Sequence, residues 1–291
     1  MRWMVLPVLF FFLYFFLGAF NYFSFGVANG SSDFLFHWQH LQGIDSREYA
    51  PAFYLLFALF APHQLLFFTA GLALVWLAIP FLLKIVSGSG WPVAVYALGV
   101  SLPHQAVYGA TFPSALVFAL FLGYLAVRER LKYPYRGILL VILLGVAPFL
   151  HSFALPLFFC VLVAEFLRLI VGSVFPVVLL VGQKIDNARA LLNVFLVQIP
   201  LPVFLLGARG LQKNLFYAML TVFSFAGAMI DFRAIGIAQL LFCLAAGPVA
   251  AKLSPKWKKA FLFYLLAQGT FFFLDFGGGM LKIAALSSGA S

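Results

Sequence analysis

Long apolar runs, divided by short connections rich in lysine and arginine, set the strongest constraint on how this chain can fold. Hydrophobic residues make up 65% of the 291 residues, and charged residues only 9%. So few charges cannot cover an ordinary soluble domain, whereas helices satisfy their own backbone hydrogen bonds inside a bilayer. We therefore expect an all-α, polytopic membrane protein.

The formal charge of +10 does not indicate nucleic acid binding, because the basic residues lie in connections between apolar runs. Such a distribution is typical of proteins oriented by positive charge on the inner side of a membrane. Cys160 and Cys243 lie in separate apolar runs without metal-ligand spacing, so they carry no information about the redox compartment.

Apolar runs of suitable length predict about eleven transmembrane helices in a single transmembrane domain covering residues 1–291, without a soluble domain. The expected spans are 3–25, 64–83, 91–107, 113–127, 137–151, 153–167, 169–183, 190–208, 212–230, 234–251 and 260–276. Prolines within or beside them predict kinked or broken helices: Pro103, Pro113, Pro148, Pro156, Pro176, Pro200 and Pro202.

The stretch 50–61 decides the topology. Pro51 and Pro62 bound it, and it is too short to cross, so we expect a helix at the outer interface within a first outer loop at 27–63. With the N-terminus cytoplasmic, thirteen of the eighteen basic residues then lie inside. The alternative separates the two most basic loops, 128–136 and 252–259, which the positive-inside rule disfavours.

This topology gathers chemically versatile side chains on the extracytoplasmic face, where we expect the active face. All five histidines fall there, and so do six of the eight acids. They are His37, His40, His63, His104, His151, Asp33, Asp45, Glu48, Asp186, Asp231 and Asp275. Polar groups at membrane depth usually mark function, which favours a site on this side.

The first outer loop is the most polar stretch on that face. A helix over 32–41, capped by Ser31 or Ser32, would place Asp33, His37 and His40 on one face, with Phe34, Leu35, Trp38 and Leu41 opposite. The spacing leaves three interpretations open: acid/base chemistry with a phosphate contact, three ligands for a metal ion, or an interfacial helix with a hydrated polar face.

Several short motifs resemble GT-C-type integral membrane glycosyltransferases. Asp33 soon after the first span, His37, Gly43 and Tyr49-Ala50-Pro51-Ala52-Phe53-Tyr54 resemble the first outer loop of that family. Gly109-Ala110-Thr111-Phe112-Pro113-Ser114 is similar to the start of a later helix in the family. His151 at a helix end, and Arg233 before the apolar helix at 234–247, also resemble family features.

The resemblance implies a GT-C-like fold and transfer of a sugar from a polyprenyl-phosphate donor to a glycan or protein acceptor. Asp33 would be the general base, and arginines and histidines would hold the lipid phosphate. The implied substrate and phosphate contacts are His37, His40, Arg47, Glu48, His104, Tyr108, His151 and Arg233, with Lys184 and Arg189 as further candidates. Membrane lipids and membrane partner subunits are implied partners, and a divalent cation is the candidate cofactor.

The chain departs from the family in ways that keep a second interpretation open. The stretch 101–108 lacks the acid often found in the next outer loop, and the chain is short with no C-terminal soluble domain. A non-catalytic transporter or lipid-binding scaffold of the same architecture would explain both. Arg233 could instead pair with Asp231, His104 and His151 could form hydrogen bonds between helices, and Tyr108 could be an interfacial anchor.

Overall fold

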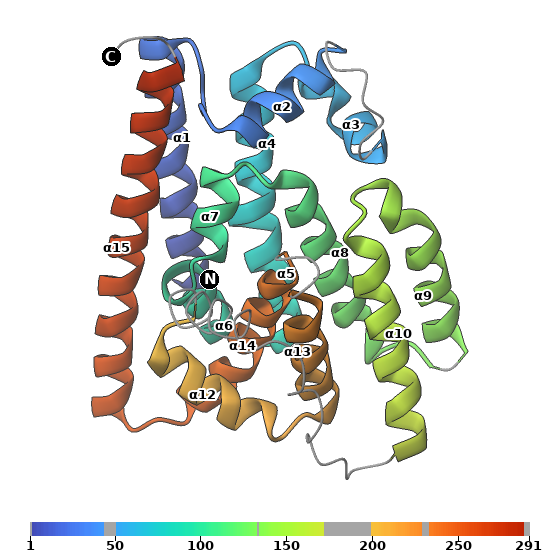
Figure 1. The fold of residues 1–291 in the computed structure, drawn as a ribbon. Helices are drawn as coiled ribbons and strands as arrows, with labels where there is room; N and C mark the ends of the chain where they lie inside the picture. The colour runs from blue at the N-terminus through green and yellow to red at the C-terminus, as the bar shows by residue number, and fades with distance from the viewer. Residues whose placement is uncertain (1, 44–50, 133, 172–198, 229–232, 288–291) are drawn as a thin grey trace.

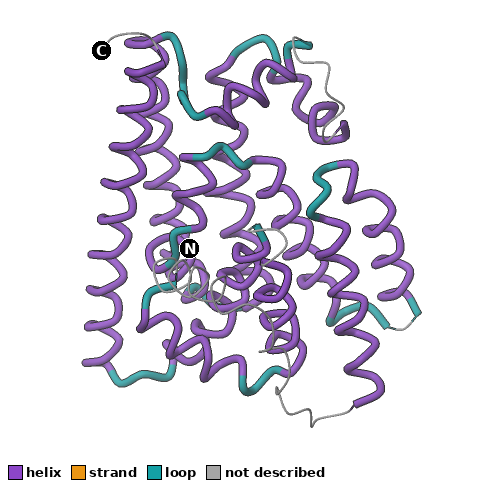
Figure 2. The backbone as a smooth tube through the Cα atoms, in the orientation of Figure 1, coloured by secondary structure: helices purple, strands orange, loops and turns teal. Residues whose placement is uncertain are grey.

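The computed structural model describes residues 2–43, 51–132, 134–171, 199–228 and 233–287. Every regular element in these ranges is a helix (Figure 2), as the apolar composition predicts. Helices satisfy each backbone hydrogen bond within one segment, which is what a chain surrounded by lipid requires.

Two peripheral helices follow the first long helix. The single turn η1 (Arg2–Met4) leads into α1 (Val5–Phe25), and Gly26 ends α1 in the left-handed conformation with φ of 77°. Next come α2 (Ser32–Leu41), α3 (Pro51–Phe57) and η2 (Ala58–Phe60). Figure 1 shows α2 and α3 together at one end of the bundle, which we call the α2 end. The helix expected between Pro51 and Pro62 therefore forms and remains peripheral.

The remaining helices make up the body of the bundle. The first group is α4 (Gln64–Ala73), the π-helical η3 (Leu74–Ala78), α5 (Ile79–Ser87), α6 (Trp91–Ala94), the π-helical η4 (Val95–Gly99), α7 (Leu102–Tyr108) and α8 (Phe112–Arg128). The second group is α9 (Tyr135–Val146), η5 (Ala147–Phe149), α10 (Ala154–Val171), α12 (Leu201–Leu211), α13 (Leu215–Ala228), α14 (Ala234–Ala251) and α15 (Pro255–Ser287).

Four helical segments in the described ranges are long and apolar enough to cross a membrane: Val5–Phe25, Gln64–Ser87, Ala234–Ala251 and Pro255–Leu286. Six shorter apolar helices accompany them, so the expected count of about eleven spans is not established. The span expected at 91–107 is broken, because Val100 is extended (φ −132°, ψ 151°) between η4 and α7. The span expected at 169–183 and the start of that at 190–208 lie mainly outside the described residues.

Three of the seven prolines singled out in the sequence begin helices, and the break before Pro103 divides an expected span as predicted. Pro103, Pro113 and Pro202 each occupy the first turn of α7, α8 and α12. A first-turn proline sacrifices no intrahelical hydrogen bond, since the first backbone amides have no partner within the helix. Pro248, which was not among them, lies inside α14.

The helix α14 is the most enclosed of the four long segments, since 83% of its 18 residues are buried. It packs against α12, α13 and α6. At Gly210 of α12, an added Cβ would lie 2.1 Å from the backbone oxygen of Ala245, so α12 and α14 touch backbone to backbone. By contrast, α1 and α15 pack along each other and expose large apolar side chains such as Phe23 and Phe263. Exposed apolar faces of this kind suit contact with lipid tails.

The opposite end of the bundle, which we call the α12 end, contains α12 and the α8–α9 and α14–α15 turns (Figure 1). These two turns belong to the two most basic loops of the sequence, 128–136 and 252–259. Permanent positive charge is therefore concentrated at the end away from α2 and α3.

Candidate functional site

The helix α2 forms with the bounds expected from the sequence, Ser32–Leu41. Ser31 begins it, since its hydroxyl oxygen accepts a hydrogen bond of 3.2 Å from the Phe34 amide. The preceding loop is anchored to the bundle by two hydrogen bonds. The side-chain oxygen of Gln64 accepts from the backbone amide of Ala28 at 2.7 Å, and the side-chain amide of Asn29 donates to the Val107 carbonyl at 2.8 Å. These contacts fix where α2 starts.

The helix does not present its histidines to solvent as a single polar face. Phe34 is fully buried against Phe67 and Phe68 of α4, and His37 is only 6% exposed because α3 packs over it. His37 Nδ1 lies 2.7 Å from the Tyr54 hydroxyl of α3. Of the three interpretations left open by the sequence, the interfacial helix with a hydrated polar face does not fit His37, because this residue is buried whereas Asp33 is exposed.

His40 lies beside the same tyrosine. Its ring stacks on Tyr54 with centroids 4.1 Å apart and an interplanar angle of 23°. Its Nδ1 atom is buried and has no hydrogen-bond partner among the residues that the structure describes. Tyr54 thus joins the two histidines, one through its hydroxyl and one through its ring.

The pKa of His37 is sensitive to residues that are distant in the sequence. It is lowered to about 3, mainly by burial and in smaller part by electrostatic interaction with His151, His40 and Arg233. A neutral imidazole at physiological pH follows from this shift. The α9–α10 turn and the start of α14 are therefore near enough to His37 of α2 to influence its charge.

His151 has a defined tautomer. It is 1% exposed, and its Nδ1 accepts a hydrogen bond of 3.0 Å from the Phe153 amide. Because a backbone amide can only donate, Nδ1 carries no proton and the ring proton must be on Nε2. His151 is thus a neutral donor through Nε2, which suits a phosphate or hydroxyl oxygen.

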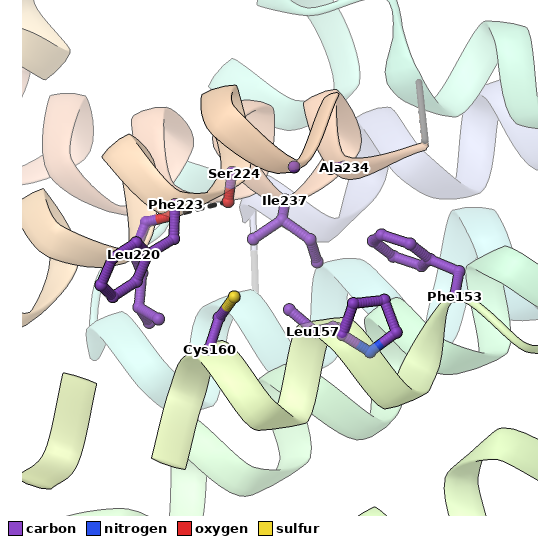
Figure 3. A pocket seen from close by; sticks show the side chains of 10 residues that line it. Phe153, Leu157, Cys160, Leu220, Phe223, Ser224, Ala234 and Ile237 are labelled. Atoms are coloured by element: carbon purple, nitrogen blue, oxygen red, sulfur yellow. Dashed lines mark hydrogen bonds between the residues drawn. The ribbon is translucent and has the colours of Figure 1, made fainter. Parts of the chain in front are cut away.

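An apolar cavity begins directly beside this cluster. Phe153 and Ala234 line it, and they follow His151 and Arg233 by two residues and one residue. Figure 3 shows its wall of side chains from α10, α13 and α14, including Leu157, Cys160 and Ile237. The cavity has a volume of about 470 Å³ including its open mouth, and the Ser224 hydroxyl nearby donates to the Leu220 carbonyl at 2.7 Å.

Asp33 stands apart from the buried cluster. It lies in the first turn of α2 and is exposed, one turn before His37. Within the described ranges, its carboxylate forms no hydrogen bond or ion pair. An exposed carboxylate at this position is accessible to a molecule arriving from the α2 end.

Two predicted site residues belong to a different part of the fold. His104 is fully buried, with Nδ1 2.8 Å from the Tyr14 hydroxyl of α1 and Nε2 3.3 Å from the Ala97 carbonyl. Tyr108 packs beside Phe276 of α15, with ring centroids 5.7 Å apart. The contacts of these two side chains are with α1, η4 and α15, so they do not support the prediction that both join the outer site.

Arg47 and Glu48 lie outside the described residues, as do Lys184 and Arg189. In the part of the chain that is described, no three side chains of His, Cys, Asp or Glu stand close enough to hold a metal ion. The interpretation of Asp33, His37 and His40 as three metal ligands therefore has no support in this geometry. The candidate divalent cation has no site formed by these residues.

Tyr54 is the residue whose importance the sequence did not reveal. It belongs to the motif at 49–54, but a tyrosine near a membrane surface is usually an interfacial anchor. Only the packing of α3 on α2 identifies it as the partner of His37.

Comparisons of the chain with protein-family models, curated proteins and solved structures gave no match.

Proposed function

We propose that this protein transfers a sugar from a polyprenyl-phosphate donor to a hydroxyl acceptor at the extracytoplasmic face of a membrane. The observation that carries the proposal is the convergence of His37, His151 and Arg233 beside an apolar cavity. A lipid-linked sugar phosphate has the matching parts, since an anionic group is joined to a long apolar chain. The resemblance to GT-C-type glycosyltransferases points to the same class of donor.

The polar end of the donor would lie among the convergent side chains. Arg233 supplies a permanent positive charge, and His151 donates a hydrogen bond from Nε2. If the Tyr54 hydroxyl donates to His37 Nδ1, that ring also carries its proton on Nε2 and becomes a second neutral donor. His40 offers a buried Nδ1 whose hydrogen-bonding capacity no described residue uses.

The isoprenoid chain would occupy the cavity between α10, α13 and α14. Apart from Ser224, the residues that line this cavity carry no polar oxygen or nitrogen in their side chains, which suits an apolar chain. Phe153 and Ala234 connect it to the polar cluster, because each closely follows a phosphate-contact candidate in the chain. A single amphiphile could therefore engage both regions.

Asp33 would act as general base. Its carboxylate takes the proton of the acceptor hydroxyl while the acceptor oxygen bonds to the sugar carbon, and the bond from that carbon to the phosphate oxygen breaks. Polyprenyl phosphate leaves with the electron pair, and the donors around His151 and Arg233 stabilise its negative charge. Every atom and proton is accounted for without a further reactant.

The test is transfer from synthetic polyprenyl-phosphate sugars by the purified protein, with Asp33→Asn as the diagnostic variant. Loss of a general base lowers the rate by roughly 10²–10⁴-fold. Asp275→Asn is the matched control, because Asp275 is also exposed but lies on α15. Full activity of Asp33→Asn would remove the proposed base. Donor binding without transfer by the wild type would favour the lipid-binding scaffold.

A further inference from the structure

A second cavity lies at the α12 end, away from the candidate site. It is formed by the end of α12, the start of α13 and the end of α14, with a volume of about 880 Å³ including its open mouth. Arg209, Lys213 and Lys252 line it together with Asn214 and Tyr217. Three permanent positive charges from separate segments therefore surround one hollow.

In the described part of the chain, these charges have no counter-charge beside them. No acidic side chain lines the cavity, and among the residues described in the structure none of the three cations forms an ion pair. Like charges around one hollow repel each other, so an anion between them would be favoured. A cationic cavity of this kind differs from the paired arginine of α8, whose charge is balanced by Glu129 and Glu165.

The start of α13 adds a further contribution. The Asn214 side chain accepts a hydrogen bond of 3.2 Å from the Tyr217 amide, so Asn214 caps this helix of 14 residues. Because Asn214 and Tyr217 both line the cavity, the positive end of the α13 dipole faces it. Helix dipole and side-chain charge thus favour the same kind of ligand.

The remaining walls are apolar and rigid. Leu244, Pro248 and Val249 of α14, with Leu253, line the cavity on one side. The wall between α12 and α14 cannot spread easily, because Gly210 rests against the Ala245 backbone. We infer that this cavity binds a phosphate group, carried either by the headgroup of an anionic phospholipid or by free phosphate.

A competing explanation is that these cations only complement helix ends, since Arg209 lies in the last turn of α12 and Lys252 caps α14. Lysine and arginine at helix C-termini commonly stabilise the helix, because their positive charge interacts favourably with the negative end of the helix dipole. That role predicts a change in stability alone. A phosphate site also predicts a change in ligand affinity, so the two are separable.

The experiment measures binding to the full-length protein in neutral detergent at fixed ionic strength. The probes are dioctanoyl phosphatidylglycerol and inorganic phosphate. The cavity variant combines Arg209→Gln, Lys213→Gln and Lys252→Gln, and the control combines Lys256→Gln, Lys258→Gln and Lys259→Gln. Both remove three charges from the same end, but the control lysines on α15 lie outside the cavity.

We expect the cavity variant to bind at least one probe roughly tenfold or more weakly, since it removes all three basic side chains that line the cavity. The control should stay within about twofold. Binding of the lipid alone identifies a headgroup site, and binding of both probes identifies a general phosphate site. Failure of both probes to bind, or equal losses in the two variants, overturns the inference. Lys213→Gln alone provides the same comparison if the triple variant does not fold.

Discussion

A buried ion pair near the α12 end offers the sharpest test of how the bundle is held together. Arg128, at the end of α8, is 4% exposed, and Glu165 of α10 is 2% exposed. The guanidinium donates from Nε to Glu165 Oε1 and, at 3.2 Å, from Nη2 to Glu165 Oε2. Tyr124 also donates to this carboxylate at 2.8 Å, and the guanidinium lies 3.8 Å from the centre of the Phe216 ring. The pair thus joins α8, α10 and α13.

We predict that Glu165→Gln destabilises the protein by about 3–5 kcal/mol, because it removes the buried counter-charge of a buried guanidinium and leaves only the exposed Glu129. The lower end is expected, since the glutamine carbonyl can still accept one hydrogen bond. The loss is a large fraction of the roughly 5–15 kcal/mol by which folded proteins are stable. Unfolding in mixed detergent micelles, followed by loss of helical circular dichroism, measures the change.

Glu129 supplies a matched control, because its carboxylate contacts the same guanidinium but is 71% exposed. Glu129→Gln should cost less than about 1 kcal/mol. Equal losses for the two variants would refute the claim that desolvation sets the strength of the Arg128 contacts. The double variant Arg128→Leu with Glu165→Leu should be more stable than Glu165→Gln, since it removes both buried charges together.

Three further outcomes follow from the structure. The pKa of His37 is about 3 in the folded protein and about 6.5 in the unfolded chain. Between these pH values the unfolded chain binds more protons, so the free energy of unfolding decreases as the pH falls. At pH 5 we expect it to be about 2 kcal/mol lower than above pH 6.5. Thermal unfolding of His37→Gln should lose this pH dependence, and His63→Gln, which alters an exposed histidine, should keep it. Cys160→Trp should fill the apolar cavity and reduce polyprenyl-phosphate binding. Phe159→Trp, at an exposed neighbouring position, should leave this binding unchanged. Equal binding by the two variants would contradict the placement of the isoprenoid chain in the cavity. Gly210→Ala should destabilise by about 1–3 kcal/mol, because its Cβ would meet the Ala245 backbone, while Gly145→Ala on α9 meets nothing and should be neutral or stabilising.

The parts of the fold that the sequence predicted are those specified by a few neighbouring residues. Ser31 begins α2 and Pro51 begins α3, because a hydroxyl cap and a first-turn proline act within one helical turn. The number of spans was not predictable in this way, since the break at Val100 depends on how η4 and α7 pack. Apolar composition predicts that a segment is buried, but not whether it continues through the membrane.

The same distinction applies to the candidate site. Asp33 and His151 were identified from their local motifs. The lowered pKa of His37, however, results mainly from its burial under α3, with smaller contributions from His151, His40 and Arg233. His104 was grouped with them because its loop faces the same side, yet its partner is Tyr14, ninety residues earlier. Helical periodicity specifies which residues share a face, whereas only tertiary packing decides which face is covered.

The two ends of the bundle offer different kinds of polar group, and this difference has a consequence for the ligands we propose. At the α2 end, His37 is neutral and His151 donates from Nε2 without a positive charge, so Arg233 supplies the permanent charge of that cluster. At the α12 end, three basic side chains line one cavity: Arg209, Lys213 and Lys252. Salt screens interactions between exposed charges more strongly than hydrogen bonds from buried neutral donors. Ionic strength should therefore weaken phosphate binding at the α12 end more than donor binding at the α2 end, which separates the two sites within one protein.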